Sequence, residues 1–293
     1  MKAVRQPVLF AAALAAALWC APVPPAAAQD QQVLMPEQSE AKAKQLIQRA
    51  IDAMGGSAFV NVHDLTCTGN IGQFDHSGQL SGFEKFVQYT EPPLKDRVEN
   101  LPQHNVIDVF NGDEGWSLDR GGVSDEPALR LVQHQDDVAK SLDNILLRRV
   151  DEPTMDIHYD GKDIVDLKQV DWVQLVDADD RTIRIAFDRE THLPIRKTVE
   201  SRDPKLNSDV LEVEYYSNYY SENGVQLPKQ ITRERNNLKI YQVFFDSCSI
   251  NTGVQDSFFT KQSLEDRWAK MPNHEKYRDK NKKGGSNTDV SAP

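Results

Sequence analysis

Apolar residues recur at helical spacing in two stretches of the chain and alternate with polar residues in most of the remainder. The first helical stretch follows a polar leader, residues 29–37, and ends at the Gly55-Gly56 pair. Its apolar positions are Ala41, Leu46, Ile47, Ala50, Ile51 and Met54. A second helix is predicted over 126–150, because Pro127 suits a first helical turn and no glycine or proline follows it. We therefore expect two amphipathic helices that cover a sheet.

Between the predicted helices the pattern changes to a period of two, which is typical of β-strands. Three strands are predicted, at residues 65–69, 82–89 and 95–99. A β-hairpin is predicted over 106–119, because two apolar runs flank Asn-Gly-Asp-Glu-Gly at 111–115. Trp116 follows this turn, where a tryptophan packs in a core more often than it contacts a ligand.

After the second helix the chain is predicted to form an antiparallel meander. Its strands lie near residues 156–159, 170–176, 182–188, 195–200, 211–219, 230–234 and 240–249. Charged residues alternate into these strands, among them Arg181, Arg184, Glu200, Glu212 and Glu214. This alternation indicates one solvated face and one apolar face. The predicted fold class is therefore mainly β (α+β), with a single curved antiparallel sheet and covering α-helices.

The N-terminus has the composition of a cleavable secretory signal. Two basic residues precede an apolar run at 8–19, and Ala26-Ala27-Ala28 supplies the small residues that cleavage requires. The run is too short to span a bilayer as a stable helix. Cleavage before Cys20, as in a lipoprotein, is the alternative, and the bulky Trp19 disfavours it. The predicted divisions are a signal peptide at 1–28, a domain at 29–262, and a tail at 263–293 that is largely disordered after a last helical turn at 263–268.

The charge of the chain limits its partners. The formal charge is −11, and removal of Lys2 and Arg5 with the signal takes it to −13. Such a surface repels phosphate backbones, so no nucleic-acid partner is expected. The basic cluster at 280–283 is interpreted as part of a solvated tail.

The three cysteines divide into one in the signal and two in the mature chain. Cys67 and Cys248 remain in an exported protein, where disulfides persist. A bridge between them would join the first predicted strand to the last and would stabilise the fold by about 4 to 5 kcal/mol in the chain-entropy model. Two buried free thiols are the alternative.

Residue patterns for catalysis or metal binding do not occur in the sequence. The seven histidines are scattered, and none is spaced with a glutamate as zinc hydrolases require. The sequence has no Gly-x-Ser-x-Gly elbow, phosphate-binding glycine loop or dinucleotide fingerprint. Asp177, Asp179 and Asp180 lack the glycine and the distal glutamate of a calcium loop. We therefore expect no catalytic residue, no metal and no cofactor.

Several short motifs occur in a characteristic order. They extend over nearly the whole mature chain, up to about residue 262. They are AMGG at 53–56, FNGDEGW at 110–116, FDRETHLP at 187–194, ENGVQLP at 222–228 and INTGVQDSFF at 250–259. In this layout the chain resembles the periplasmic outer-membrane lipoprotein-sorting proteins, the LolA-like family.

The resemblance implies an incomplete β-barrel, or half-barrel, at 29–262 whose hydrophobic cavity, covered by helices, holds acyl chains of lipoproteins or other lipids. A shield of this kind is useful because each methylene removed from water contributes about 0.8 kcal/mol. The chain departs from dedicated carriers in lacking the arginine-bearing segment that they place soon after the first helix. Related sequences also accompany exported zinc peptidases, but no peptidase motif is present here.

The leading hypothesis is a non-catalytic periplasmic carrier or sensor that binds lipid-like or lipoprotein acyl cargo as a monomer. Phe110, Trp116 and Leu131 are the predicted cavity-lining residues, covered by the helix at 126–150. The alternative is a structural or interaction module of the cell envelope, with an envelope protein as partner and no ligand cavity. An enzyme is the third hypothesis, although no nucleophile, base and orienting group can be named together.

Overall fold

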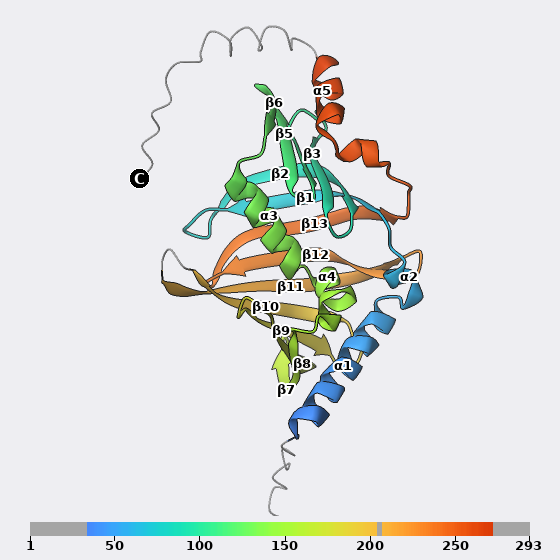
Figure 1. Cartoon of the computed structure of the whole chain (residues 1–293), viewed down its shortest axis with the longest axis vertical. Coiled ribbons are helices and arrows are strands. Elements are labelled where there is room, and N and C mark those ends of the chain that lie inside the picture. The colour runs from blue at the N-terminus through green and yellow to red at the C-terminus, as the bar shows by residue number, and fades with distance from the viewer. Residues whose placement is uncertain (1–33, 204–206, 272–293) are drawn as a thin grey trace, which may run out of the picture. The chain divides into compact units, whose positions relative to one another are not determined.

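The computed structural model describes residues 34–203 and 207–271 (Figure 1). These residues form one antiparallel sheet of 13 strands in the order β6-β5-β4-β3-β2-β1-β13-β12-β11-β10-β9-β8-β7. The strands are β1 (Leu65–Phe74), β2 (Leu80–Glu91), β3 (Lys95–Leu101), β4 (Ile107–Asn111), β5 (Glu114–Asp119), β6 (Gly122–Asp125), β7 (Asp156–Val165), β8 (Lys168–Val176), β9 (Thr182–Asp188), β10 (Pro194–Asp203), β11 (Ser208–Glu222), β12 (Val225–Arg235) and β13 (Leu238–Ile250). Because the end strands β6 and β7 do not pair, the sheet stays open, which confirms the predicted incomplete barrel.

Helical segments accompany the sheet. They are α1 (Pro36–Ala53), α2 (Ser57–Val60), α3 (Ala128–Lys140), α4 (Leu142–Leu147), the short 3-10 segments η1 (Arg149–Asp151) and η2 (Asp256–Phe259), and α5 (Lys261–Ala269). No helix within the described ranges is long and apolar enough to cross a membrane. The expected signal segment at 1–28, with Cys20, and the expected disordered tail at 273–293 lie outside the described residues.

Helix α1 confirms the first predicted amphipathic helix and covers an edge of the sheet. It buries Ala43, Leu46, Ile47 and Ala50 on one side. The Ser39 hydroxyl of α1 accepts a hydrogen bond from the Tyr159 backbone N–H at 3.0 Å, on the end strand β7. An exposed strand edge would otherwise offer its backbone to other chains, so α1 protects this one.

The single helix predicted over 126–150 is wrong, because it is broken at Ser141. This residue has extended dihedral angles, with φ −65° and ψ 144°, and separates α3 from α4. The Ser141 hydroxyl donates to the Val138 carbonyl oxygen at 2.9 Å, which satisfies one of the acceptors that the end of α3 leaves free. The break allows α3 to lie across the strands while α4 packs into the core (Figure 1).

The sheet consists of two meanders that meet at a central pair of strands, β1 and β13. Cys67 lies opposite Cys248 in this pair, and their sulfur atoms form a disulfide that spans 181 positions of sequence. The register shifts between Thr68 and Gly69. A Cβ atom on Gly69 would collide with the Phe244 carbonyl oxygen, so this close approach of β13 to β1 requires glycine.

The two faces of the sheet carry different cores. On the inner face, defined here as the face beneath α3, apolar strand residues pack with α1, α2 and α4 around Ile145, Ile183 and Phe187. On the outer face, Ile107, Val109 and Leu118 pack with Phe259 and Leu264 of the C-terminal segments. Helix α5 contains the last helical turn predicted at 263–268, and its Leu264 packs in the outer-face core.

Candidate functional site

A cavity of about 560 Å³ lies between the inner face of the sheet and the α3–α4 segment. Its walls come from α2, α3, α4 and six neighbouring strands, β1, β2, β3, β11, β12 and β13. The apolar lining residues are Met54, Phe59, Val62, Leu65, Val138, Leu142, Leu147, Val225, Leu227, Ile231, Phe245 and Ile250. The cavity is thus mostly apolar, as expected for small-molecule sites in general.

Polar contacts hold α3 over this cavity. Lys140 is the buried residue of α3, and none of its apolar side chains is buried. Near its start, Arg130 pairs with Asp108 of β4 at 3.1 Å. At its end, Lys140 pairs with Glu212 of β11 at 2.7 Å, and Asp137 pairs with Arg233 of β12 at 2.7 Å. Helix α3 therefore crosses the inner face from β4 to β11 and is anchored at both ends by ion pairs.

Glu212 and Glu214 of β11 do not lie on a solvated face, contrary to the sequence-based interpretation. Their side chains are 14% and 15% exposed, because α3 covers this part of the sheet. Burial favours the neutral form of Glu212, but Arg233 and Lys140 hold its pKa at about 2. Burial acts on Glu214 in the same way, and Lys197, at 2.7 Å, and Arg233 keep its pKa low. Both carboxylates are therefore charged at neutral pH and belong to a paired network.

The opposite wall carries a second polar group of residues. Asp96 of β3 accepts hydrogen bonds from Gln88 at 2.8 Å and Thr90 at 3.0 Å, and burial raises its pKa. His134 of α3 lies beside it and stacks on the Phe110 ring with centroids 4.0 Å apart. Burial lowers the pKa of His134, so its imidazole is neutral at pH 7.

A second cavity of about 400 Å³ adjoins the first on the same face. Four residues line both spaces, namely Gln88, Ile231, Tyr241 and Phe245. Its other lining residues are Ile71, Gln73, Glu84, Phe86, Val98, Asn100, Val106, Asp108 and Val243. The Cys67–Cys248 disulfide lies in the floor of the first cavity, beside this junction.

The three predicted lining residues occupy different places. Phe110 is 8% exposed and lies beneath α3, against His134. Leu131 of α3 lies over Gly115, where an added Cβ would be 2.8 Å from the Leu131 Cδ2 atom. Trp116 packs on the outer face with the core that α5 covers. Both cavities are lined by other residues within the described ranges, mainly by the inward-facing positions of β1, β2, β12 and β13.

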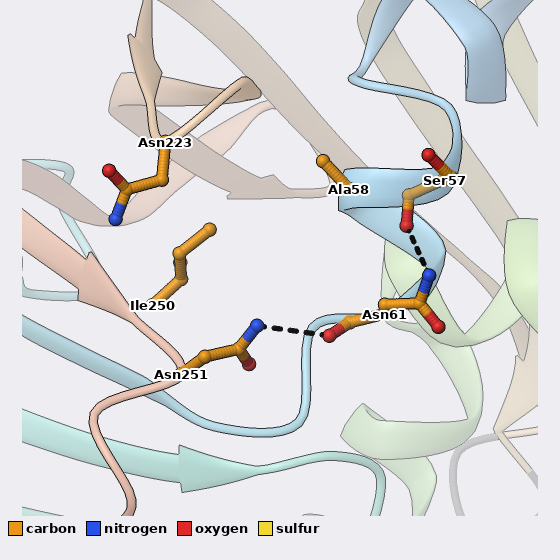
Figure 2. Close-up of a pocket in the computed structure, with 6 residues that line it drawn as sticks. All are labelled: Ser57, Ala58, Asn61, Asn223, Ile250 and Asn251. Carbon is orange, nitrogen blue, oxygen red and sulfur yellow. Dashed lines mark hydrogen bonds between the residues drawn. The ribbon is translucent and has the colours of Figure 1, made fainter.

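A polar pocket of about 470 Å³ lies at the α2 end of the first cavity (Figure 2). Ile250 lines both spaces. The Asn61 side chain donates to the Ser57 carbonyl oxygen at 2.7 Å, and the Asn251 side chain donates to the Asn61 carbonyl oxygen at 3.1 Å (Figure 2). The first bond lies within α2 and its C-terminal cap, and the second joins this cap to Asn251, which follows β13.

Within the ranges that the structure describes, no three His, Cys, Asp or Glu side chains are arranged to hold a metal ion. The acidic turn at Asp177 is instead tied by Arg181 at 2.7 Å and Arg149 at 3.2 Å. The lining of the first cavity combines apolar side chains with polar and charged ones, among them Asp96, His134 and Arg233.

Comparison with known proteins identifies the fold. No protein-family model and no curated protein matches the chain. A domain assigned to the outer membrane lipoprotein-sorting proteins of Vibrio parahaemolyticus is 10% identical, and the match covers 77% of this chain and 99% of that one with a TM-score of 0.52. A DUF1329 family protein from Desulfovibrio piger is 12% identical, with coverage of 76% and 98% and a TM-score of 0.53. A LolA superfamily protein from Nitrosomonas europaea is 10% identical, with coverage of 76% and 99% and a TM-score of 0.49. From the first two likenesses, the chain shares the fold of this lipoprotein-sorting domain and of the DUF1329 family protein, in agreement with the fold predicted from its sequence.

Proposed function

We propose that this protein is a non-catalytic carrier or sensor that binds lipid-like or lipoprotein acyl cargo on the inner face of its sheet. The observation that carries the proposal is the cavity of about 560 Å³ beneath α3 and α4, with its mainly apolar walls. An acyl chain placed there would be removed from water, which is worth about 0.8 kcal/mol for each buried methylene.

The way in which α3 is attached supports reversible binding. The Arg130–Asp108 pair at the start of α3 joins partly exposed side chains (48% and 31%) and exchanges readily with water, whereas the Lys140–Glu212 pair at its end is buried. A helix packed through a buried apolar stripe would instead have to expose that stripe in order to move. We propose that cargo enters when the Arg130–Asp108 ion pair at the start of α3 opens while the buried pairs at its other end hold.

We also propose that the protein acts in the periplasm after export through its N-terminal signal. The amino-acid pattern at 1–28 and the disulfide between Cys67 and Cys248 support this location, because disulfides persist in oxidising compartments.

The proposal is tested with the mature protein purified from its own cell envelope. Native mass spectrometry and organic extraction are expected to reveal a bound lipid, and a fluorescent fatty acid is expected to bind to delipidated protein. Ile231→Trp fills the space where the two cavities meet and should weaken probe binding by at least about tenfold. Ile164→Trp on β7, where the side chain is 67% exposed, is the matched control. Absence of lipid from the extract together with absence of probe binding would show that the proposal is wrong.

A second candidate function, an interaction module of the cell envelope, is favoured by apolar side chains on the β1–β2 hairpin. Leu80 and Phe83 are each 60% exposed and lie over Gly72. Crosslinking from position 83 in intact envelopes should then capture one defined protein, and Phe83→Ser should abolish that product. The protein is expected to be monomeric in solution without such a partner.

A further inference from the structure

The polar pocket at the α2 end of the first cavity is lined entirely by uncharged residues. They are Ser57, Ala58, Asn61, Asn223, Ile250 and Asn251. Asn223, in the turn between β11 and β12, lies on one side of the space, and the residues of α2 and its cap lie on the other, with Ile250 between them (Figure 2). The volume of about 470 Å³ is within the range of small-molecule sites, about 300 to 1,000 Å³. The pocket is therefore large enough for a small ligand.

Several polar groups of this pocket remain available to a ligand. Within the described ranges, the Asn223 amide and the Ser57 hydroxyl make no hydrogen bond with another residue. The Asn61 and Asn251 amides each donate one N–H, to the carbonyl oxygens of Ser57 and Asn61, and keep the second. Amide and hydroxyl groups supply both donors and acceptors, so the pocket can exchange hydrogen bonds with a ligand in both directions.

Backbone contacts hold the two sides of the pocket together. The Gln226 backbone N–H donates to the Met54 carbonyl oxygen at 2.9 Å, which joins the start of β12 to the C-terminal cap of α1. A Cβ atom on Gly55 would lie 2.5 Å from the Gly224 carbonyl oxygen, so this close approach requires glycine. The pocket is therefore formed before a ligand binds, which lowers the cost of ordering its walls.

The lining selects an uncharged ligand with several hydroxyl groups. A charged group would lose its water and find no opposite charge among the lining residues. An acyl chain would cover the Asn223 amide without giving it a partner. A peptide backbone is matched by a row of backbone groups along a strand edge, whereas these polar side chains come from three separate segments around a compact space. A sugar ring fits both parts of the lining, because its hydroxyls pair with amides and its C–H groups contact Ala58 and Ile250.

We propose that this pocket binds an uncharged sugar unit of an oligosaccharide. Hydroxyls of the sugar exchange hydrogen bonds with the Asn223 amide and the Ser57 hydroxyl, and its C–H groups lie on Ile250. The inference goes beyond the proposed function, because it concerns a different space and a different class of ligand.

Proton–nitrogen NMR of the labelled mature protein tests the proposal, because the side-chain amide signals of asparagines are observed directly. The uncharged disaccharides cellobiose and N,N′-diacetylchitobiose are the probes, and glucuronic acid and triglycine amide are the charged and peptide comparisons. At least one disaccharide is expected to shift the side-chain signals of Asn223 and Asn251. Glucuronic acid and triglycine amide should shift neither signal.

Asn223→Gly removes the amide and keeps the turn, since φ at this position is 47° and glycine adopts positive φ readily. This variant should bind the disaccharide about five- to tenfold more weakly. Asn237→Gly is the matched control, because Asn237 has φ 64° in the turn between β12 and β13 and lines none of the three spaces described above. It should leave the affinity unchanged.

Ala58→Leu fills the pocket and should weaken the disaccharide at least about tenfold, whereas Val60→Leu, on the same helix at a side chain that is 55% exposed, should not. Thermal unfolding of each variant verifies that it is folded. No shift with either disaccharide, or an unchanged affinity in both Asn223→Gly and Ala58→Leu, would overturn the inference. Shifts caused only by triglycine amide or glucuronic acid would overturn it as well. Binding of the fluorescent fatty acid is measured separately, so failure of this inference leaves the proposed function standing.

Discussion

Replacement of Glu212 by glutamine removes a charge from the network that anchors the end of α3. Glu212 accepts hydrogen bonds from Lys140 at 2.7 Å and from Arg233 at 2.8 Å. Burial alone would raise the pKa of Glu212, but the two cations lower it from 4.5 to about 2. A pKa difference of this size corresponds to about 3 kcal/mol of stability at neutral pH.

The sign of the pH dependence follows from the lowered pKa. Because the folded state binds the proton more weakly than the unfolded chain, the contribution of Glu212 is complete above the unfolded pKa of 4.5. It is lost as the pH falls through the folded pKa of about 2. Glu212→Gln should therefore cost about 3 kcal/mol near pH 7 and about 1 kcal/mol near pH 3.

Urea unfolding followed by far-ultraviolet circular dichroism at the two pH values measures this difference. Glu200→Gln on β10 is the control, since that side chain is exposed, and should change the free energy of unfolding by less than about 0.5 kcal/mol. The same loss for Glu212→Gln at both pH values, or no loss near pH 7, would refute the assignment of Glu212 as a charged anchor of α3.

Three further predictions concern the rest of the sheet. Replacement of both Cys67 and Cys248 by serine should lower the free energy of unfolding by about 5 kcal/mol in the chain-entropy model, given the separation of 181 positions, and a reductant should then have no further effect in urea titrations. Gly115→Ala should destabilise the protein by roughly 1 to 3 kcal/mol, because the new methyl group meets Leu131 and Phe110, whereas Gly82→Ala meets nothing within 4 Å and should lower the melting temperature far less. Trp116 lies on the outer face, so an acyl ligand should leave its fluorescence unchanged, and a ligand-induced change that disappears in Trp116→Phe would contradict this placement.

The local elements of this fold follow largely from residue periodicity. The apolar stripe and the glycine pair define α1, and alternation with turn residues defines most of the strands. The break at Ser141 was missed because no glycine or proline marks it. A serine directly before Leu142 and Asp143 is nevertheless a typical helix start, so the sequence contains a signal for a second, shorter helix there.

The faces of the strands were harder to assign than the strands themselves. Val109 pairs with Trp116 and Phe110 pairs with Gly115, so Phe110 and Trp116 lie on opposite faces. Side chains alternate strictly between the two faces along a strand. Counting outward from a two-residue turn at Gly112 and Asp113 would therefore have placed Phe110 and Trp116 on opposite faces. The prediction instead grouped both aromatic residues together as cavity lining.

The candidate site depends on contacts that no local pattern reveals. Alternating charges such as Glu212 and Glu214 are typical of an exposed strand face, and they become buried only because α3 crosses above them with Lys140. The cavity walls likewise combine β1 with β13, which are about 180 residues apart. Both features arise from tertiary arrangement, which overrides what short stretches of sequence favour.

The central pairing of β1 with β13 also imposes an order on biosynthesis. Strand β1 is among the first elements to be synthesised, yet its partner on one side is the last strand of the sheet. Until β13 emerges, one edge of β1 stays open to other chains and the Cys67 thiol is without its partner Cys248. Completion of the sheet is therefore a late, long-range event, and newly made chains truncated before Leu238 should be the most prone to aggregate.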